Sequence, residues 1–209
     1  MGSRAYAAEY LPEDEPLLAA RANAADLGGT EPVPPEVGAT LRFLACAVGA
    51  RTAVEIGTGC GSSGIWLLRG MRPGSTLTSV DTEPEYQRMA RKAFTQAGFA
   101  PNQCRLILGR ALDVLPRLSD SAYDMVFCDA DPRDYPDYLS AALRLLRTGG
   151  IVAFNNALQA DPPGNGEPQN ALPHDGAFDL AGQVRADERL VPVLLPLGDG
   201  LLAAVKRSD

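Results

Sequence analysis

A regular alternation of apolar runs and helical segments between residues 52 and 155 constrains the fold of this chain more than any other feature. Five apolar runs lie at 52–56, 76–81, 104–109, 123–129 and 150–156, and segments with helical periodicity lie between them at 63–71, 83–98, 111–118 and 135–150. Strands alternating with helices of this length form βαβ units, and continuous apolar strands are typical of a parallel sheet covered on both faces. The sequence therefore predicts a doubly wound α/β fold with helices on both faces.

The segments outside this alternation have other characters. Residues 1–12 look like a loose tail, and two helical patterns, 13–27 and 36–50, make residues 13–48 an N-terminal helical region. Residues 157–176 are polar and rich in Pro and Gly, which predicts a long loop on the substrate side, and a helix is expected over 177–189. Two apolar runs joined by Gly198-Asp199-Gly200 predict a terminal hairpin. We find no repeat, and expect one domain over residues 1–209.

Charge and composition narrow the partners and the compartment. The formal net charge is −7, which argues against nucleic acid or an anionic membrane as partner. No apolar run approaches the roughly 20 residues that span a bilayer, and the N-terminus has no apolar signal region. Four scattered cysteines and a single histidine disfavour a zinc site. We expect a cytoplasmic protein whose cysteines are reduced and buried.

The glycine-rich turn after the first strand, in Ala53–Leu68, indicates which cofactor is bound. Gly59, Gly61 and Gly64 match G-x-G-x-x-G, but counted from the glycine that follows the strand, Gly57, the third position is Ser62. A carboxylate at Glu55 would repel a pyrophosphate and suit a cationic ligand.

An acid at the end of the second strand completes the pattern. The carboxylate of Asp81 can accept hydrogen bonds from ribose hydroxyls there. The combination fits S-adenosylmethionine (AdoMet), which has a ribose and a sulfonium but no phosphate. The structural alternative is that the glycines only make a tight turn between strand and helix.

Five motifs in order make the sequence similar to class I AdoMet-dependent methyltransferases, and more narrowly to the catechol/caffeoyl-CoA O-methyltransferase family. They are VEIGTGCGSSGIWL, SVDTEPE, YDMVFCDAD with the following DY, LLRTGGIVAFNNAL and LVPVLLPLGDGLLAAVKR. The similarity runs from about Val33 to Lys206. It implies a Rossmann-like sheet of seven strands, mostly parallel, with an antiparallel C-terminal hairpin. It also implies a homodimer with the N-terminal helices at its interface.

The resemblance also implies roles for individual residues. Residues holding the methionine part of AdoMet would be Glu55, Gly57, Thr58 and Ser63. Asp81 would bind the ribose, and Val33 and Ala111 would line the pocket. Asp129, at the end of the fourth strand, would lie next to the reactive methyl group and act in catalysis.

The family's metal site is altered in this chain. The family holds a divalent metal with an Asp after strand four and an Asp-Asn pair after strand five, near a Lys. Here the first Asp is Asp129, the pair is Asn155-Asn156, and Pro132 replaces the Lys. Asp129, Asn155 and Asn156 could still give Mg²⁺ three oxygen ligands, and Asp131 could supply the missing carboxylate. The sequence therefore leaves two alternatives: a metal site of lowered affinity, or no metal site.

His174, in the predicted loop 157–176, could replace the missing base, since an imidazole accepts protons near neutral pH. The first hypothesis is an AdoMet-dependent O-methyltransferase acting on the hydroxyl of a small phenolic or catechol-like acceptor. The alternatives are a metal-independent methyltransferase with another small acceptor and a catalytically weakened AdoMet-binding protein. A dinucleotide oxidoreductase ranks last.

Overall fold

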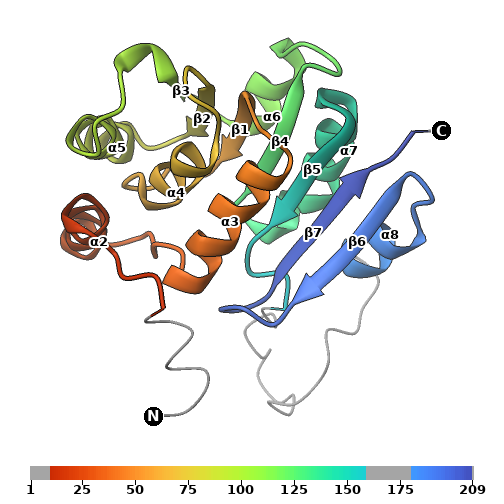
Figure 1. The fold of residues 1–209 in the computed structure, drawn as a ribbon, viewed down its shortest axis with the longest axis horizontal. Coiled ribbons are helices and arrows are strands. Elements are labelled where there is room, and N and C mark those ends of the chain that lie inside the picture. The colour runs from red at the N-terminus through yellow and green to blue at the C-terminus, as the bar shows by residue number, and fades with distance from the viewer. Residues whose placement is uncertain (1–9, 159–179, 209) are drawn as a thin grey trace.

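The computed structural model describes residues 10–158 and 180–208, and its centre is a seven-stranded sheet in the order β3-β2-β1-β4-β5-β7-β6. Five strands are parallel: β1 (Thr52–Ile56), β2 (Thr76–Asp81), β3 (Cys104–Leu108), β4 (Tyr123–Cys128) and β5 (Leu146–Phe154). β6 (Leu190–Leu195) and β7 (Leu201–Lys206) form the C-terminal hairpin, and β7 runs antiparallel to β5 (Figure 1). The predicted fold class is confirmed.

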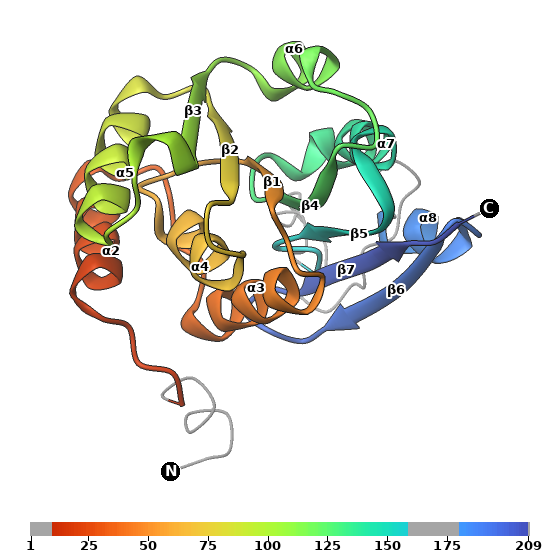
Figure 2. The same ribbon diagram turned by 45° about the horizontal axis from the view of Figure 1, so that its top comes forward.

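Helices cover the sheet in two layers (Figure 2). One layer contains α2 (Glu15–Leu27), α3 (Pro35–Ala47), α4 (Ser62–Gly70) and α5 (Pro84–Gln96). The other contains α6 (Ala111–Val114), α7 (Tyr135–Leu145) and α8 (Leu180–Ala186). Successive strand side chains point to opposite faces, so Ala53 packs in the first core and Val54 in the second. Short 3₁₀ turns lie at Pro101–Gln103, Leu115–Arg117 and Pro132–Asp134.

Two predicted helices are shorter than expected. The helix predicted over 135–150 ends at Leu145, because the chain enters β5 at Leu146, which pairs with Tyr123 before the register shifts. Gly149, with φ +79°, lies within that irregular stretch, so the glycines belong to a bulged strand instead of ending a helix. The helix predicted over 111–118 becomes α6 followed by a 3₁₀ turn that contains Pro116, which has no backbone N–H for a continued helix.

The structure bears on two of the expectations from composition, the membrane spans and the burial of the cysteines. No helix in the part of the chain that the structure describes is long and apolar enough to cross a membrane. All four cysteines are free. Cys60, Cys104 and Cys128 are buried as expected, but Cys46 is exposed, because it lies on the outer side of α3.

Candidate cofactor and acceptor site

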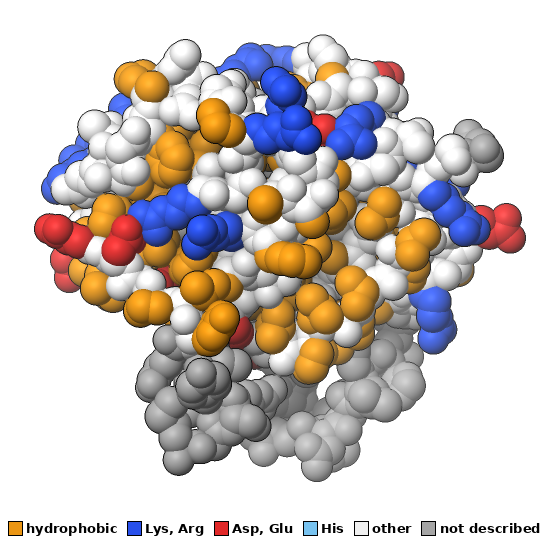
Figure 3. Space-filling view, viewed as in Figure 1, with side chains coloured by type: hydrophobic (Ala, Val, Ile, Leu, Met, Phe, Trp, Pro, Cys, Tyr) orange, Lys and Arg blue, Asp and Glu red, His pale blue; other side chains and the backbone are white. Residues whose placement is uncertain are grey.

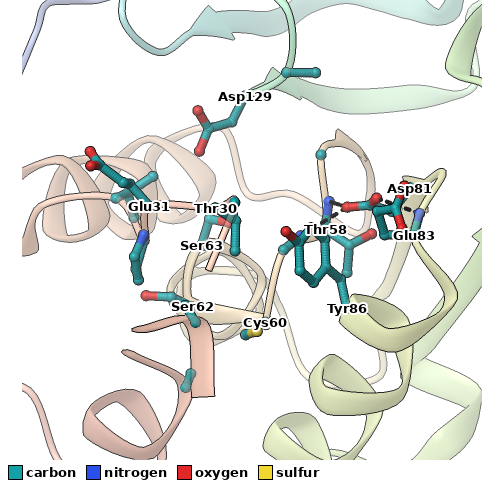
Figure 4. A pocket seen from close by; sticks show the side chains of 18 of the residues that line it. Thr30, Glu31, Thr58, Cys60, Ser62, Ser63, Asp81, Glu83, Tyr86 and Asp129 are labelled. Carbon is teal, nitrogen blue, oxygen red and sulfur yellow. Dashed lines mark hydrogen bonds between the residues drawn. The ribbon is translucent and has the colours of Figure 1, made fainter. Parts of the chain in front are cut away.

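A cavity of about 400 Å³ opens at the carboxyl ends of β1, β2 and β4. It lies where the strand order reverses between β1 and β4, the usual ligand crevice of doubly wound sheets. Its walls come from α2, segment 29–33, turn 57–63, the start of α5 and the residues after β2 and β4 (Figure 4). Its volume lies in the range of small-molecule sites.

The first wall is the glycine turn, whose backbone lies against the end of β4. Gly57 has φ +92°, and a Cβ there would lie 2.0 Å from the carbonyl oxygen of Asp129. Real Cβ atoms do not approach that closely, so only glycine fits. The turn brings the backbone at Gly57 next to Asp129, and both residues line the cavity.

Asp81 braces the same turn from the end of β2. Its Oδ2 accepts backbone hydrogen bonds from Thr58 (2.9 Å) and Gly59 (3.0 Å), and its Oδ1 accepts one from Glu83 (2.9 Å) (Figure 4). A carboxylate offers about four acceptor positions, so Asp81 can hold the turn and still accept from a ligand hydroxyl.

Glu55 lies behind the cavity lining and is fully buried. Its carboxylate accepts hydrogen bonds from the hydroxyls of Ser63 (2.7 Å) and Ser79 (2.5 Å), and Ser79 is hydrogen-bonded to Thr58 (2.7 Å). Burial raises the pKa of Glu55 to about 8, although both serine hydrogen bonds oppose that rise. Glu55 therefore positions Ser63 and Thr58, which do line the cavity.

The cavity is acidic. No Lys, Arg or His is among its described lining residues, whereas four of them carry a carboxylate: Glu31, Asp81, Glu83 and Asp129. This charge distribution disfavours a phosphate-bearing dinucleotide and suits a ligand with positive groups.

Asp129 and Asn155 meet where β4 and β5 end side by side. Nδ2 of Asn155 donates a hydrogen bond to Oδ1 of Asp129 at 2.9 Å, and Asn155 is 3 % exposed. The hydroxyl of Tyr135 on α7 donates to the backbone oxygen of Asn155 at 2.9 Å. Burial raises the pKa of Asp129 to about 6, and the hydrogen bond from Asn155 opposes this rise.

The three metal ligands that the resemblance implies, Asp129, Asn155 and Asn156, include a single carboxylate. The described residues contain no group of three or more His, Cys, Asp or Glu side chains that could hold a metal ion. Asn155 directs an N–H toward Asp129, so Asp129 faces a donor where a second carboxylate would share a metal. The carboxylate of Asp131 accepts from the backbone and guanidinium of Arg133. Asn156, the third predicted metal ligand, has a left-handed backbone conformation with φ +56°.

The structure brings together most, but not all, of the residues selected from the sequence. The cavity is lined by Val33, Gly57, Thr58, Ser63, Asp81 and Asp129. Ala111 is buried in the second core and is not among the lining residues. His174 and most of the predicted loop 157–176 lie outside the described residues.

Sequence reasoning missed the contribution of α2 and of the segment that follows it. Ala20, Ala24, Thr30 and Glu31 line the cavity, as does Tyr86 of α5, whose hydroxyl donates to the backbone oxygen of Gly28 at 2.8 Å. The only sequence signal was the Gly28-Gly29 helix stop, which does not indicate where the chain turns next.

Comparison with known proteins fits this geometry. A family model described as O-methyltransferase matches residues 6–207. The protein named "Probable O-methyltransferase Rv1220c" of Mycobacterium tuberculosis (strain ATCC 25618 / H37Rv) is 47% identical over 205 residues, which cover 97% of this chain and 89% of that protein.

Two crystal structures share the fold. A Corynebacterium glutamicum protein has a TM-score of 0.84 and 31% identity, covering 99% of this chain and 96% of that one. The O-methyltransferase TomG of Streptomyces achromogenes, involved in tomaymycin synthesis and solved in complex with SAM, has a TM-score of 0.83 and 27% identity, covering 98% of this chain and 95% of that one. The chain belongs to the O-methyltransferase family and is an AdoMet-dependent methyltransferase.

Proposed function

We propose that this enzyme transfers the methyl group of AdoMet to the hydroxyl of a small phenolic or catechol-like acceptor. One observation carries the proposal: Asp81 and Asp129 belong to the same cavity but follow different strands, β2 and β4 (Figure 4). Asp81 provides a carboxylate for the ribose on one side, and Asp129 with Asn155 provides polar groups that would bind the acceptor hydroxyl on the other.

The cavity residues divide the cofactor between them. Asp81 would accept hydrogen bonds from the ribose, while Gly57, Thr58 and Ser63 would hold the methionine part. The acidic lining suits its ammonium and sulfonium groups. Bound there, AdoMet supplies an electrophilic methyl group.

Asp129 and Asn155 would act on the acceptor. Methyl transfer is an in-line displacement, so the hydroxyl oxygen must give up its proton as its bond to the methyl carbon forms. Asp129 would orient the hydroxyl and accept that proton through the carboxylate oxygen that Asn155 leaves free. Asn155 holds the carboxylate at the edge of the sheet, and Tyr135 holds Asn155.

The second candidate is methyl transfer without a resident metal. The hydrogen bond from Asn155 to Asp129 favours it, because a neutral donor satisfies the carboxylate that would otherwise share a cation. The metal assignment for Asp129, Asn155 and Asn156 stays a prediction, and so does the role of His174.

A homodimer is part of the proposal. The outer sides of α3 and the β6–β7 hairpin form an apolar surface in which Phe43, Val191, Val193 and Val205 are 68%, 51%, 46% and 38% exposed (Figure 3). Val191 pairs with Val205, and Val193 pairs with Ala203, which packs in the α3 core, so these valines face the α3 side. Apolar patches of this kind mark interaction sites, and one self-complementary patch suffices for a two-fold dimer.

A cytoplasmic location is also proposed. It is supported by the four free cysteines, since a reducing compartment keeps thiols unpaired.

The experiment is methyl transfer from labelled AdoMet to a panel of catechols and simple phenols, run with Mg²⁺ and with EDTA. O-methylated products in both conditions are expected. Products only with Mg²⁺ would overturn the metal-independent candidate and leave the acceptor class standing. Tight S-adenosylhomocysteine binding with no product from any phenol would overturn the acceptor class. A His174→Ala variant in the same assay separates the two candidate bases: turnover that persists leaves Asp129 as the proton acceptor, and loss of turnover assigns that role to His174.

A further inference from the structure

The segment that joins α2 to α3 forms a wall of the cofactor cavity, although it contributes no helix or strand there. Thr30, Glu31, Pro32 and Val33 line the cavity, and Gly29 before them has φ +76°. This wall has few regular backbone hydrogen bonds of its own, so its shape depends on the side chains that reach it.

Arg21 on α2 reaches the wall from outside the cavity. Its Nη2 donates to the backbone oxygen of Val33 at 2.5 Å, and its Nη1 lies 3.4 Å from that of Pro32. Arg21 itself is not among the residues lining the cofactor cavity. It therefore acts on the cavity through the backbone of two lining residues.

Glu13, just before α2, fixes the guanidinium in place. Its Oε1 accepts from Nη2 of Arg21 at 2.8 Å, and its Oε2 accepts from Nε. The side chain of Glu13 is 6% exposed and that of Arg21 is 27% exposed. A bidentate pair aligns the planar guanidinium, so that its remaining N–H groups point at the wall.

We propose that Arg21, held by Glu13, is a positioning residue that keeps Pro32 and Val33 in the shape that binds the cofactor. The inference rests on the proposed cofactor cavity. Arginine is required because one planar group must reach a carboxylate and two carbonyl oxygens at once. A lysine has a single nitrogen and cannot span these acceptors.

A second ion pair on the same helix provides a matched control. Arg69 of α4 donates to Asp14, which occupies the N-cap position of α2, at 2.6 Å. This pair also ties α2 to the rest of the protein, but neither residue lines the cavity. Arg21→Gln and Arg69→Gln each remove an ion pair at the N-terminal end of α2, and only the first touches the wall.

The test measures calorimetric binding of S-adenosylhomocysteine, the KM for AdoMet and unfolding without ligand for the whole chain. Arg21→Gln should weaken binding about tenfold and raise the KM for AdoMet with little change in kcat, whereas Arg69→Gln should leave both near wild type. A Glu13→Gln/Arg21→Gln variant, which leaves no unpaired buried charge, should weaken binding as Arg21→Gln does. Arg21→Lys should not restore binding.

Outcomes for the inference and for the cavity are separable. Binding by Arg21→Gln and by Glu13→Gln/Arg21→Gln that equals wild-type binding overturns the inference. The inference is also overturned if Arg21→Gln and Arg69→Gln both bind S-adenosylhomocysteine more weakly, each in proportion to its loss of stability. Wild-type binding that Asp81→Asn leaves unchanged would instead overturn the proposed cavity.

Discussion

Asn155 donates a hydrogen bond from Nδ2 to Oδ1 of Asp129 at 2.9 Å, across the adjacent ends of β5 and β4. The two strands are in parallel register up to the pair Cys128 and Phe154, so the residue that follows each strand faces its neighbour. A neutral amide thus satisfies the carboxylate of Asp129, which lines the cavity at the end of β4. The Oδ1 of Asn155 is buried without a hydrogen-bond partner among the described residues.

Asn155→Asp should create a divalent-cation site. It places a second carboxylate beside Asp129, and two like charges at this distance are stabilised by a shared cation. Calorimetric titration with Mg²⁺ should show at least tenfold tighter binding than wild type, about 1.4 kcal/mol. Asn102→Asp adds the same charge at an exposed site in the Pro101–Gln103 turn and should bind as wild type does. Equally tight Mg²⁺ binding by wild type and Asn155→Asp would show that the native site already holds the metal, and no binding by either would show that two carboxylates here do not make a site.

Gly57→Ala should be far more harmful than Gly74→Ala. Both glycines have positive φ, +92° and +74°, so each alanine adds a backbone cost of about 1 kcal/mol or more. At Gly74 a new Cβ meets nothing within 4 Å, whereas at Gly57 it would lie 2.0 Å from the Asp129 carbonyl oxygen. Urea unfolding should show a modest decrease in the free energy of unfolding for Gly74→Ala. Gly57→Ala should show a larger decrease, together with weaker S-adenosylhomocysteine binding. Equal losses would mean that the close approach has no cost.

The sheet could be predicted because its strands carry their signal locally. Thr76–Asp81 is a strand with the predicted bounds, and Asp81 lies at its carboxyl end as expected. The predicted C-terminus of the helix over 135–150 was wrong, because pairing with Tyr123, a distant residue, decides where β5 begins.

The site was only partly predictable for the same reason. The role of Glu55 in holding the methionine part of the cofactor stays a prediction, and its burial behind Ser63 depends on Ser79 from the neighbouring strand. The contribution of Thr30 and Glu31 depends on how α2 packs and on contacts from Arg21 and Tyr86. No periodicity or local motif encodes such tertiary contacts.

Phe43→Lys should shift the protein from dimer to monomer. Phe43 is 68% exposed on α3, within the apolar surface proposed for the dimer, and a lysine there would bury a charge in a packed interface. Pro192 removes a backbone N–H from the edge strand β6, so the dimer should form through this face instead of through edge pairing. Light scattering after gel filtration measures the mass. Leu108→Lys, at an exposed site on the opposite edge strand β3, should leave it unchanged. A wild-type monomer would contradict the dimer.

Glu55→Gln should change how stability depends on pH. The pKa of Glu55 rises from its usual 4.5 to about 8 in the folded protein, because burial disfavours the charge. Below pH 4.5 the carboxyl is protonated in both states, so its contribution to stability is fully present. As pH rises toward 8, the unfolded state releases its proton while the folded state keeps it, so that contribution falls and is lost as pH passes through 8. Glutamine does not titrate, so the variant should gain stability relative to wild type between pH 6 and 8.

Urea unfolding at pH 6, 7 and 8 measures this difference. Glu85→Gln is the control, since Arg88 lowers the pKa of Glu85 and its charge is the same in both states throughout that window. The free energy of unfolding of Glu85→Gln should differ from that of wild type by a constant amount at all three pH values. The free energy of unfolding of Glu55→Gln should instead rise steadily relative to that of wild type as pH increases. Parallel curves for all three proteins would mean that Glu55 is ionised inside the fold. Its two serine hydrogen bonds would then stabilise a buried negative charge behind the cofactor cavity.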